Sequence, residues 1–229
     1  MKVAYTLLTV TEPTRPFRAV EYTDEQDRSR FGDWFRSLDA VLAARVASAV
    51  AKLEAGNFGA AKAIGDGVFE CSIHTGPGLR VYYGRRGAEL VILLGGGTKR
   101  RQRADIRSSE DGLVGVPTES GAMPLTRDFR DTVAARVAAD PDFARALLAE
   151  GARELLAGDA DTGRALLRDY VNATVGFAAV ADDMGSNPKS VMRMLGPDGN
   201  PTIDSLSGLL ASLQRRTGVT LDVTADVAA

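Results

Sequence analysis

The sequence predicts two successive domains, an α+β domain with an antiparallel sheet and a helical pair, then an all-α domain. Apolar and polar residues alternate with a period of two through much of residues 68–94, as in strands with one buried face. From residue 129 onward, apolar residues recur at helical spacing. A polar segment with glycine and proline, residues 108–124, lies between the two patterns. We therefore predict domains at 1–107 and 125–229, joined by a linker at 108–124.

A pair of helices is expected early in the first domain. Thr23 and Gln26 resemble a capping box, which predicts a helix over Asp24–Ser37. An apolar stripe predicts a second helix over Ala40–Glu54, ended by Gly56.

The remaining elements of this domain are strands, so the expected order is β–α–α–β–β–β. The last strand is apolar on both faces, which is typical of the centre of a sheet. The four strands of this order are expected at Arg18–Tyr22, Val68–His74, Leu79–Gly84 and Glu89–Leu94, and a further strand-like stretch precedes them at Val3–Val10.

Helical stripes account for the second domain. A final helix should begin after an N-cap at Thr202 and stop at Gly218. The preceding helices are expected at Phe129–Ala138, Pro141–Leu156 and Thr162–Ala173, followed by two short helices around Gly185.

Those two short helices have the spacing of a helix-turn-helix. Ala181 is small enough for two helices to cross, Gly185 suits a left-handed turn, and Val191 can lock the second helix. Together with "GRALLRDYVNATVGFAAVADDMGSNPKSVMRMLGPDGNPT", the motif resembles Cro/Xre-type domains and, more specifically, HigA-type antitoxins over about residues 123–222. The resemblance implies a recognition helix in the major groove of operator DNA. The implied DNA-binding residues are Asn187, Lys189, Ser190 and Arg193. A helix-turn-helix that binds only protein is the alternative.

Positive charge gathers where the last strand of the first domain ends. Residues 1–107 hold 17 basic and 12 acidic residues, a net charge of +5, while residues 108–229 carry −7. A basic unit joined to an acidic one suggests a domain directed at nucleic acid and a partner that neutralises it. The cluster that follows the strand consists of Lys99, Arg100, Arg101, Arg103 and Arg107.

The order of elements and the phrases "GPGLRVYY" and "ELVILLGGG" resemble HigB-like toxins of the RelE/ParE superfamily, from about Phe31 to Ile106. The resemblance implies metal-independent cleavage of mRNA on the ribosome, with cations that stabilise phosphate charge and a side chain that moves a proton. The implied catalytic residues are Arg80, Tyr82, Lys99 and Arg101, and the implied RNA-binding residues are Arg100, Arg103 and His74. The alternatives are a surface histidine at His74, an exposed cross-strand pair at Arg80 and Tyr82, and arginines that only bind ribosomal RNA.

The leading hypothesis is a fused type II toxin–antitoxin protein whose antitoxin half covers the toxin half and represses its own operator. HigB-like toxins continue into a C-terminal helix that "RSSEDGLVGVPTES" replaces here, so a DNA-binding regulator with a dead toxin domain is the alternative. Gyrase poisoning of the ParE kind is a third. The expected partners are the ribosome and mRNA, operator DNA, and a second copy in a homodimer.

Few residues suit a metal or a disulfide, since the chain has one cysteine and one histidine. We expect no cofactor and no metal. The longest aliphatic run is too short for a membrane span, and the N-terminal stretch lacks a signal-peptide pattern, so we expect a cytoplasmic protein.

Overall fold

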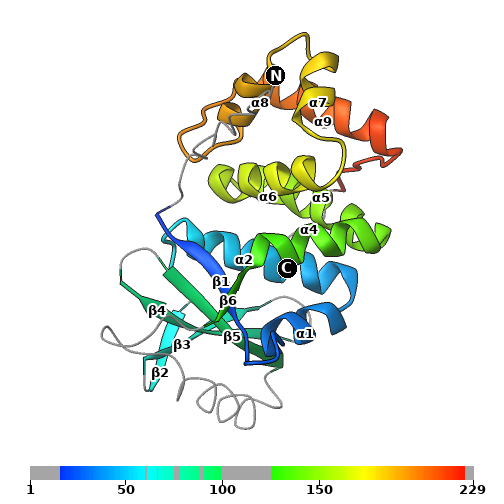
Figure 1. Ribbon diagram of the computed structural model, residues 1–229. Helices are drawn as coiled ribbons and strands as arrows, with labels where there is room; N and C mark the ends of the chain where they lie inside the picture. The colour runs from blue at the N-terminus through cyan, green and yellow to red at the C-terminus, as the bar shows by residue number, and fades with distance from the viewer. Residues whose placement is uncertain are drawn as a thin grey trace, which may run out of the picture.

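The computed structural model describes residues 16–59, 61–65, 67–74, 78–87, 90–98 and 125–224. In this part of the chain, helices cover one face of a sheet and further helices stack beyond them (Figure 1). In chain order the elements are β1 (Arg18–Tyr22), α1 (Arg30–Ser37), α2 (Ala40–Glu54), β2 (Ala61–Gly65), β3 (Val68–Ile73), β4 (Leu79–Arg86), β5 (Leu90–Thr98), β6 (Thr126–Asp128), α4 (Phe129–Ala139), α5 (Pro141–Leu156), α6 (Ala160–Ala173), α7 (Phe177–Asp183), α8 (Pro188–Met194) and α9 (Ile203–Thr217).

The six strands form a mixed sheet in the order β2-β3-β4-β5-β1-β6. Strands β2 to β5 pair antiparallel, but β1 runs parallel to β5. The prediction of an antiparallel sheet is therefore wrong at this pair. The chain passes through α1, α2 and three strands between β1 and β5, so no hairpin imposes opposite directions on them.

Two strands, β2 and β6, were not predicted from the sequence. The half-exposed β2 pairs with β3, and the three residues of β6 pair antiparallel with β1. Because β6 follows residue 124, the expectation of a purely helical second part is wrong. Three residues are too few to show a period of two. The strand expected at Val3–Val10 and the linker at 108–124 lie outside the described residues.

The first helix begins later than its expected start at Asp24. The Asp24 carboxylate accepts hydrogen bonds from the backbone N–H groups of Gln26 and Arg28, which holds the segment in a turn. Ser29 is the actual N-cap, since its hydroxyl accepts from the N–H of Gly32 at 2.9 Å. The capping box at Thr23 is therefore wrong: a local side-chain turn takes the place of the expected helix start.

Caps elsewhere agree with expectation. The helix α2 has the predicted bounds, with Asp39 as its N-cap and Gly56 at φ +80° just beyond its end. The hydroxyl of Thr202 accepts from the N–H of Ser205, and Gly218 ends α9 in the left-handed region.

Buried residues lie on both faces of the sheet. The face toward the helices contributes Leu79, Val81 and Tyr83 to the main core. The opposite face carries a smaller cluster that includes Tyr82 and Ile92. The expected alternation along β4 is confirmed, but its second face is buried as well.

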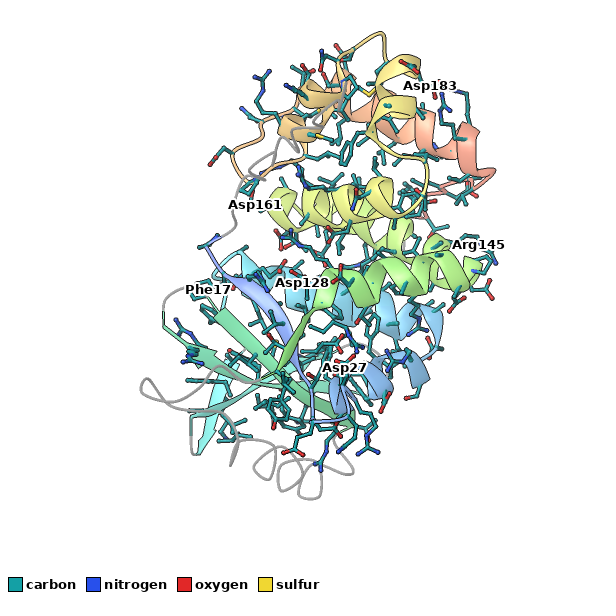
Figure 2. All side chains as sticks on the ribbon, viewed as in Figure 1. Phe17, Asp27, Asp128, Arg145, Asp161 and Asp183 are labelled. Atoms are coloured by element: carbon teal, nitrogen blue, oxygen red, sulfur yellow. The ribbon has the colours of Figure 1, made fainter. Side chains whose placement is uncertain are left out.

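One continuous core joins the two parts of the chain. Phe31 and Phe35 of α1 make edge-to-face contacts with Phe129 of α4, at ring centroid distances of 5.4 and 5.2 Å. Phe35 also meets Phe143 of α5 at 5.7 Å. Side chains accordingly fill the space between the first helical layer and α4–α5 (Figure 2). Beyond them, α6 supports the layer of α7, α8 and α9 (Figure 1).

Candidate nucleic-acid interface

The helices α7 and α8 form a tight helix–turn–helix. Ala181 and Val191 are buried, and Gly185 has φ +58°, as their spacing predicts. The N–H of Ser186 donates to the carbonyl of Ala181 at 2.9 Å and closes the turn. This geometry fixes α8 against α7 and leaves the other side of α8 open to solvent.

The residues predicted to bind DNA lie on that open side. Asn187, Lys189 and Arg193 are exposed and Ser190 is half-buried. The side-chain oxygen of Asn187 caps α8 by accepting from the N–H of Lys189 at 2.9 Å, which leaves its NH2 group as the donor it offers. The four side chains provide two cations and two neutral hydrogen-bonding groups on one short helix.

An ion pair that the sequence analysis did not anticipate anchors α7 to α9. Asp183 accepts from the guanidinium of Arg216 at 2.7 and 2.6 Å, and from the hydroxyl of Ser212 at 2.6 Å (Figure 2). These bonds from Arg216 and Ser212 lower the pKa of Asp183 to about 2. The helix-turn-helix is therefore fastened to α9 by a bidentate contact.

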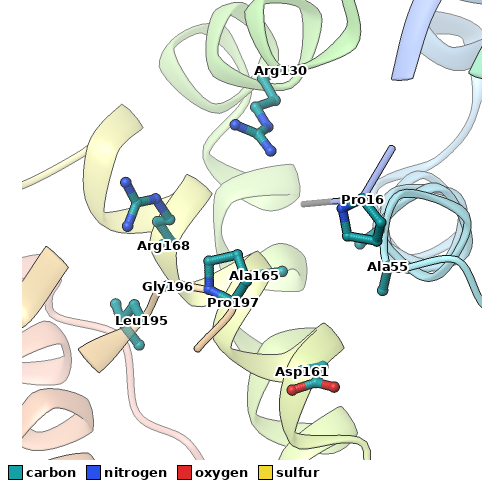
Figure 3. A pocket seen from close by; sticks show the side chains of 10 residues that line it. Pro16, Ala55, Arg130, Asp161, Ala165, Arg168, Leu195, Gly196 and Pro197 are labelled. Atoms are coloured by element: carbon teal, nitrogen blue, oxygen red, sulfur yellow. The ribbon is translucent and has the colours of Figure 1, made fainter. Parts of the chain in front are cut away.

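Two buried arginines of α6 support α8 from below. Arg168 donates to the carbonyl of Met192 at 2.7 Å, near the end of α8. Arg164 donates to the carbonyl of Pro197 at 3.3 Å, in the loop that follows. A cavity of about 210 Å³ lies beside Arg168, lined also by Pro16 of the N-terminal part (Figure 3). The helix α8 thus rests on the same layer that contacts the first part of the chain.

In the N-terminal part, Arg80 and Tyr82 do not form an exposed pair. Arg80 is 14% exposed and its Nε lies 2.7 Å from a carboxylate oxygen of Glu70. Tyr82 is fully buried, so its ring offers no open face to an RNA base. It lies opposite Glu70 on β3, in the cluster behind the sheet. His74 is exposed just after β3, as expected for a surface histidine.

The basic cluster at Lys99, Arg100, Arg101 and Arg103 lies outside the described residues. The glycines before it are described, and one of them has a packing role. A Cβ at Gly96 would overlap the indole of Trp34 from α1. Gly96 therefore leaves room for the Trp34 ring, which occupies the space beside it.

A polar seam joins α2 to α5. Arg45 lies 2.9 Å from Glu150, while Lys52 and the Ser48 hydroxyl lie 3.1 and 2.7 Å from Glu154. No pattern within either helix predicted these contacts between α2 and α5, because the paired residues are more than 100 positions apart. The opposite net charges of the two parts were the signal that could have suggested it.

A second contact between the parts caps α1. Arg136 of α4 donates to the carbonyls of Phe35 and Leu38 at the end of α1. Its guanidinium lies between the rings of Phe35 and Phe143, at 5.2 and 4.7 Å from their centroids. The sequence analysis missed this contact as well.

Within the described residues, no group of three or more acidic, histidine or cysteine side chains is arranged to hold a metal. No helix in the same part of the chain is both long and apolar enough to cross a membrane.

Comparison with known proteins identifies one relative. The chain is 40% identical over 81 residues to an uncharacterized protein of Haemophilus influenzae. The match covers 35% of this chain and 82% of the relative. No family model matches the chain, and no solved structure matches it significantly.

Proposed function

This chain belongs to the same family as the uncharacterized Haemophilus influenzae protein, and from that premise we propose that it is a fused toxin–antitoxin protein. The C-terminal part binds operator DNA through α8 and represses transcription from that operator. The N-terminal part is a ribosome-dependent mRNA endonuclease that the C-terminal part holds inactive. Operator binding as a homodimer follows from the same proposal, because paired half-sites require two recognition helices.

The observation that carries the proposal is the outward face of α8. Lys189 and Arg193 are exposed cations suited to phosphates or guanine edges, and Asn187 and Ser190 can contact bases. Arg168 bonds the end of α8, and Asp183 ties α7, against which α8 packs, to α9, so little conformational freedom has to be lost on binding.

Inhibition in this proposal follows from the contacts between the two parts. The first strand of the C-terminal part, β6, extends the N-terminal sheet at β1, and α5 packs along α2. A tethered partner acts at an effective concentration of about millimolar for a short flexible tether. Toxicity then requires the two parts to separate.

A specific observation favours the second candidate, a DNA-binding regulator whose toxin part is inactive. The Arg80 guanidinium forms an ion pair with Glu70, and Tyr82 is buried. In this arrangement neither of these two side chains is presented to solvent as an RNA-cleaving site requires.

Two assays on the full chain separate the candidates. Binding to the DNA upstream of its own coding region should be lost in Lys189→Ala/Arg193→Ala and kept in Lys62→Ala/Arg145→Ala, a control of equal charge change. In a reconstituted translation reaction, Arg136→Met should loosen the contact between the parts and release mRNA cleavage, which Lys99→Ala then abolishes. Binding without any cleavage assigns the regulator, and the absence of both contradicts the proposal.

A further inference from the structure

A cationic face of α2 is covered by carboxylates of the C-terminal part. Arg45, Ser48 and Lys52 follow one another at spacings of three and four residues, so they share one side of the helix. Lys52 also lies 3.5 Å from Asp159. The helix α2 contributes no carboxylate to this set, and each described acidic partner named here comes from the C-terminal part of the chain.

The covering carboxylates are deeply buried. Glu150 is 5% exposed and Glu154 is 2% exposed, and Arg153 beside them donates to Glu150 at 2.9 and 2.6 Å. Burial raises the pKa of Glu154, but hydrogen bonds from Ser48 and Lys52 and the charges of Lys52 and Arg153 outweigh it, so the net pKa is lowered. Glu154 is thus held as an anion against α2.

Stability alone does not require charges at this position. A buried ion pair recovers little more than the cost of removing its charges from water, and apolar residues of similar volume often serve as well or better. The adjoining seam is apolar, with Val50 of α2 and Leu147 of α5 in the common core. Net stability therefore leaves the charges on this face of α2 unexplained.

A cavity lies beside this face. It measures about 320 Å³ and is lined by Arg45, Ser48 and Lys52, by Asn57, and by His74 at the end of β3, as well as by Glu150 and Glu154. Arg45 and Lys52 retain 22% and 34% exposure of their side chains. Cations, hydroxyls and amides are the groups that bind phosphates of nucleic acids.

We propose that the α2 face formed by Arg45, Ser48 and Lys52 binds the phosphate backbone of single-stranded RNA, and that Glu150 and Glu154 occupy the positions of two phosphates. The inference rests on the proposed function, since it takes the N-terminal part to be directed at RNA. Glu150 and Glu154 lie one helical turn apart, roughly 5–6 Å, a spacing comparable to that of neighbouring phosphates in an extended strand. The C-terminal part thereby inhibits by competing for the RNA site, separately from any contact with catalytic residues.

The test measures RNA binding by fluorescence anisotropy with a short labelled single-stranded RNA. Every protein carries Lys189→Ala/Arg193→Ala, which removes binding by α8. Glu150→Gln/Glu154→Gln keeps the shape of the seam but removes its negative charge. We expect this variant to bind RNA at least about tenfold more tightly at low salt. The gain should shrink as salt rises, because the logarithm of the binding constant falls with the logarithm of the salt concentration by about 0.7 for each phosphate contacted.

Two controls establish where the RNA binds. Adding Arg45→Gln/Lys52→Gln should remove the gain, and Asp33→Asn/Asp142→Asn, with the same change in net charge at exposed sites, should not produce it. A gain in the second control, a gain that survives without the α2 cations, or no gain at all overturns the inference.

Folding is checked by a cooperative thermal transition. If the double variant does not fold, Glu150→Gln alone is compared in the same way, because it leaves the bonds of Glu154 to Ser48 and Lys52 in place. We then expect RNA binding to tighten by about threefold. No gain in the single variant also overturns the inference. Operator binding and mRNA cleavage are measured independently, so a failure of this site is distinguishable from a failure of the proposed function.

Discussion

Replacing Arg136 by methionine should destabilise the whole chain. The guanidinium is 8% exposed and joins the two parts by donating to the carbonyls of Phe35 and Leu38 while lying between two aromatic rings. Methionine fills a similar volume but donates no hydrogen bond, so the two carbonyls at the end of α1 lose the bonds from Arg136.

The magnitude follows from the contacts that are lost. Hydrogen bonds from a charged donor contribute about 1.5–3 kcal/mol each, and a cation over an aromatic ring about 0.5–2 kcal/mol. Part of this loss is offset because the guanidinium no longer has to be desolvated, a cost that also lowers the pKa of Arg136. We therefore expect a loss of about 2–4 kcal/mol in the free energy of unfolding.

Urea unfolding followed by far-UV circular dichroism measures this loss. Arg145→Met is the matched control, because Arg145 lies on the outer surface of α5 and pairs with exposed Asp142 (Figure 2). Its replacement should cost no more than about 0.5 kcal/mol. A cost below about 1 kcal/mol for Arg136→Met would show that the contact is incidental to the joining of the two parts.

Three further predictions concern single contacts. The tie from Asp183 to Arg216 depends on pH: the pKa of Asp183 is about 2 in the folded chain and 3.8 ordinarily, so its stabilisation is full above pH 4 and lost as pH falls towards 2. In Asp183→Asn, the stability of the helix-turn-helix, followed by NMR, should fall less between pH 4 and pH 2 than in the unchanged chain. An equal fall in both proteins would refute the assignment of this pH dependence to Asp183. Gly96→Ala should cost about 1–3 kcal/mol by forcing a Cβ into the Trp34 ring, measured by thermal unfolding; a neutral result would contradict the close packing. Burial raises the pKa of Cys71 to about 11, so alkylation by iodoacetamide at neutral pH should await unfolding, and rapid modification of the folded chain would contradict this.

Sequence patterns predicted the longer and better-capped elements well. The bounds of α2 and α5 are as expected, because each has an apolar stripe between an N-terminal aspartate cap and a C-terminal stop. The helix-turn-helix was also recognisable, since Gly185 and Val191 fill positions that few other residues suit.

The failures share a physical cause, which is that the deciding contact is absent from the local sequence. The start of α1 moved because the Asp24 side chain stabilises a turn in place of the helix. The strand β6 exists only because β1 provides an edge beside it. Tyr82 has the alternation of an exposed residue, yet it is buried because the face it occupies has its own apolar cluster.

The same limit applies to the candidate sites. The α8 face could be predicted because four residues of one short helix define it. The seam between α2 and α5 could not, because Arg45 and Glu150 are 105 residues apart and each alone is an ordinary helical surface charge.

The strand β6 has a consequence for how the chain is made. Ribosomes synthesise proteins from the N-terminus, so β1 emerges more than 100 residues before the strand that pairs with its outer edge. Phe31 and Phe35 are likewise synthesised long before Phe129 and Phe143, the rings against which they pack. Synthesis therefore passes through no stage at which the first part is fully assembled and the second part is missing.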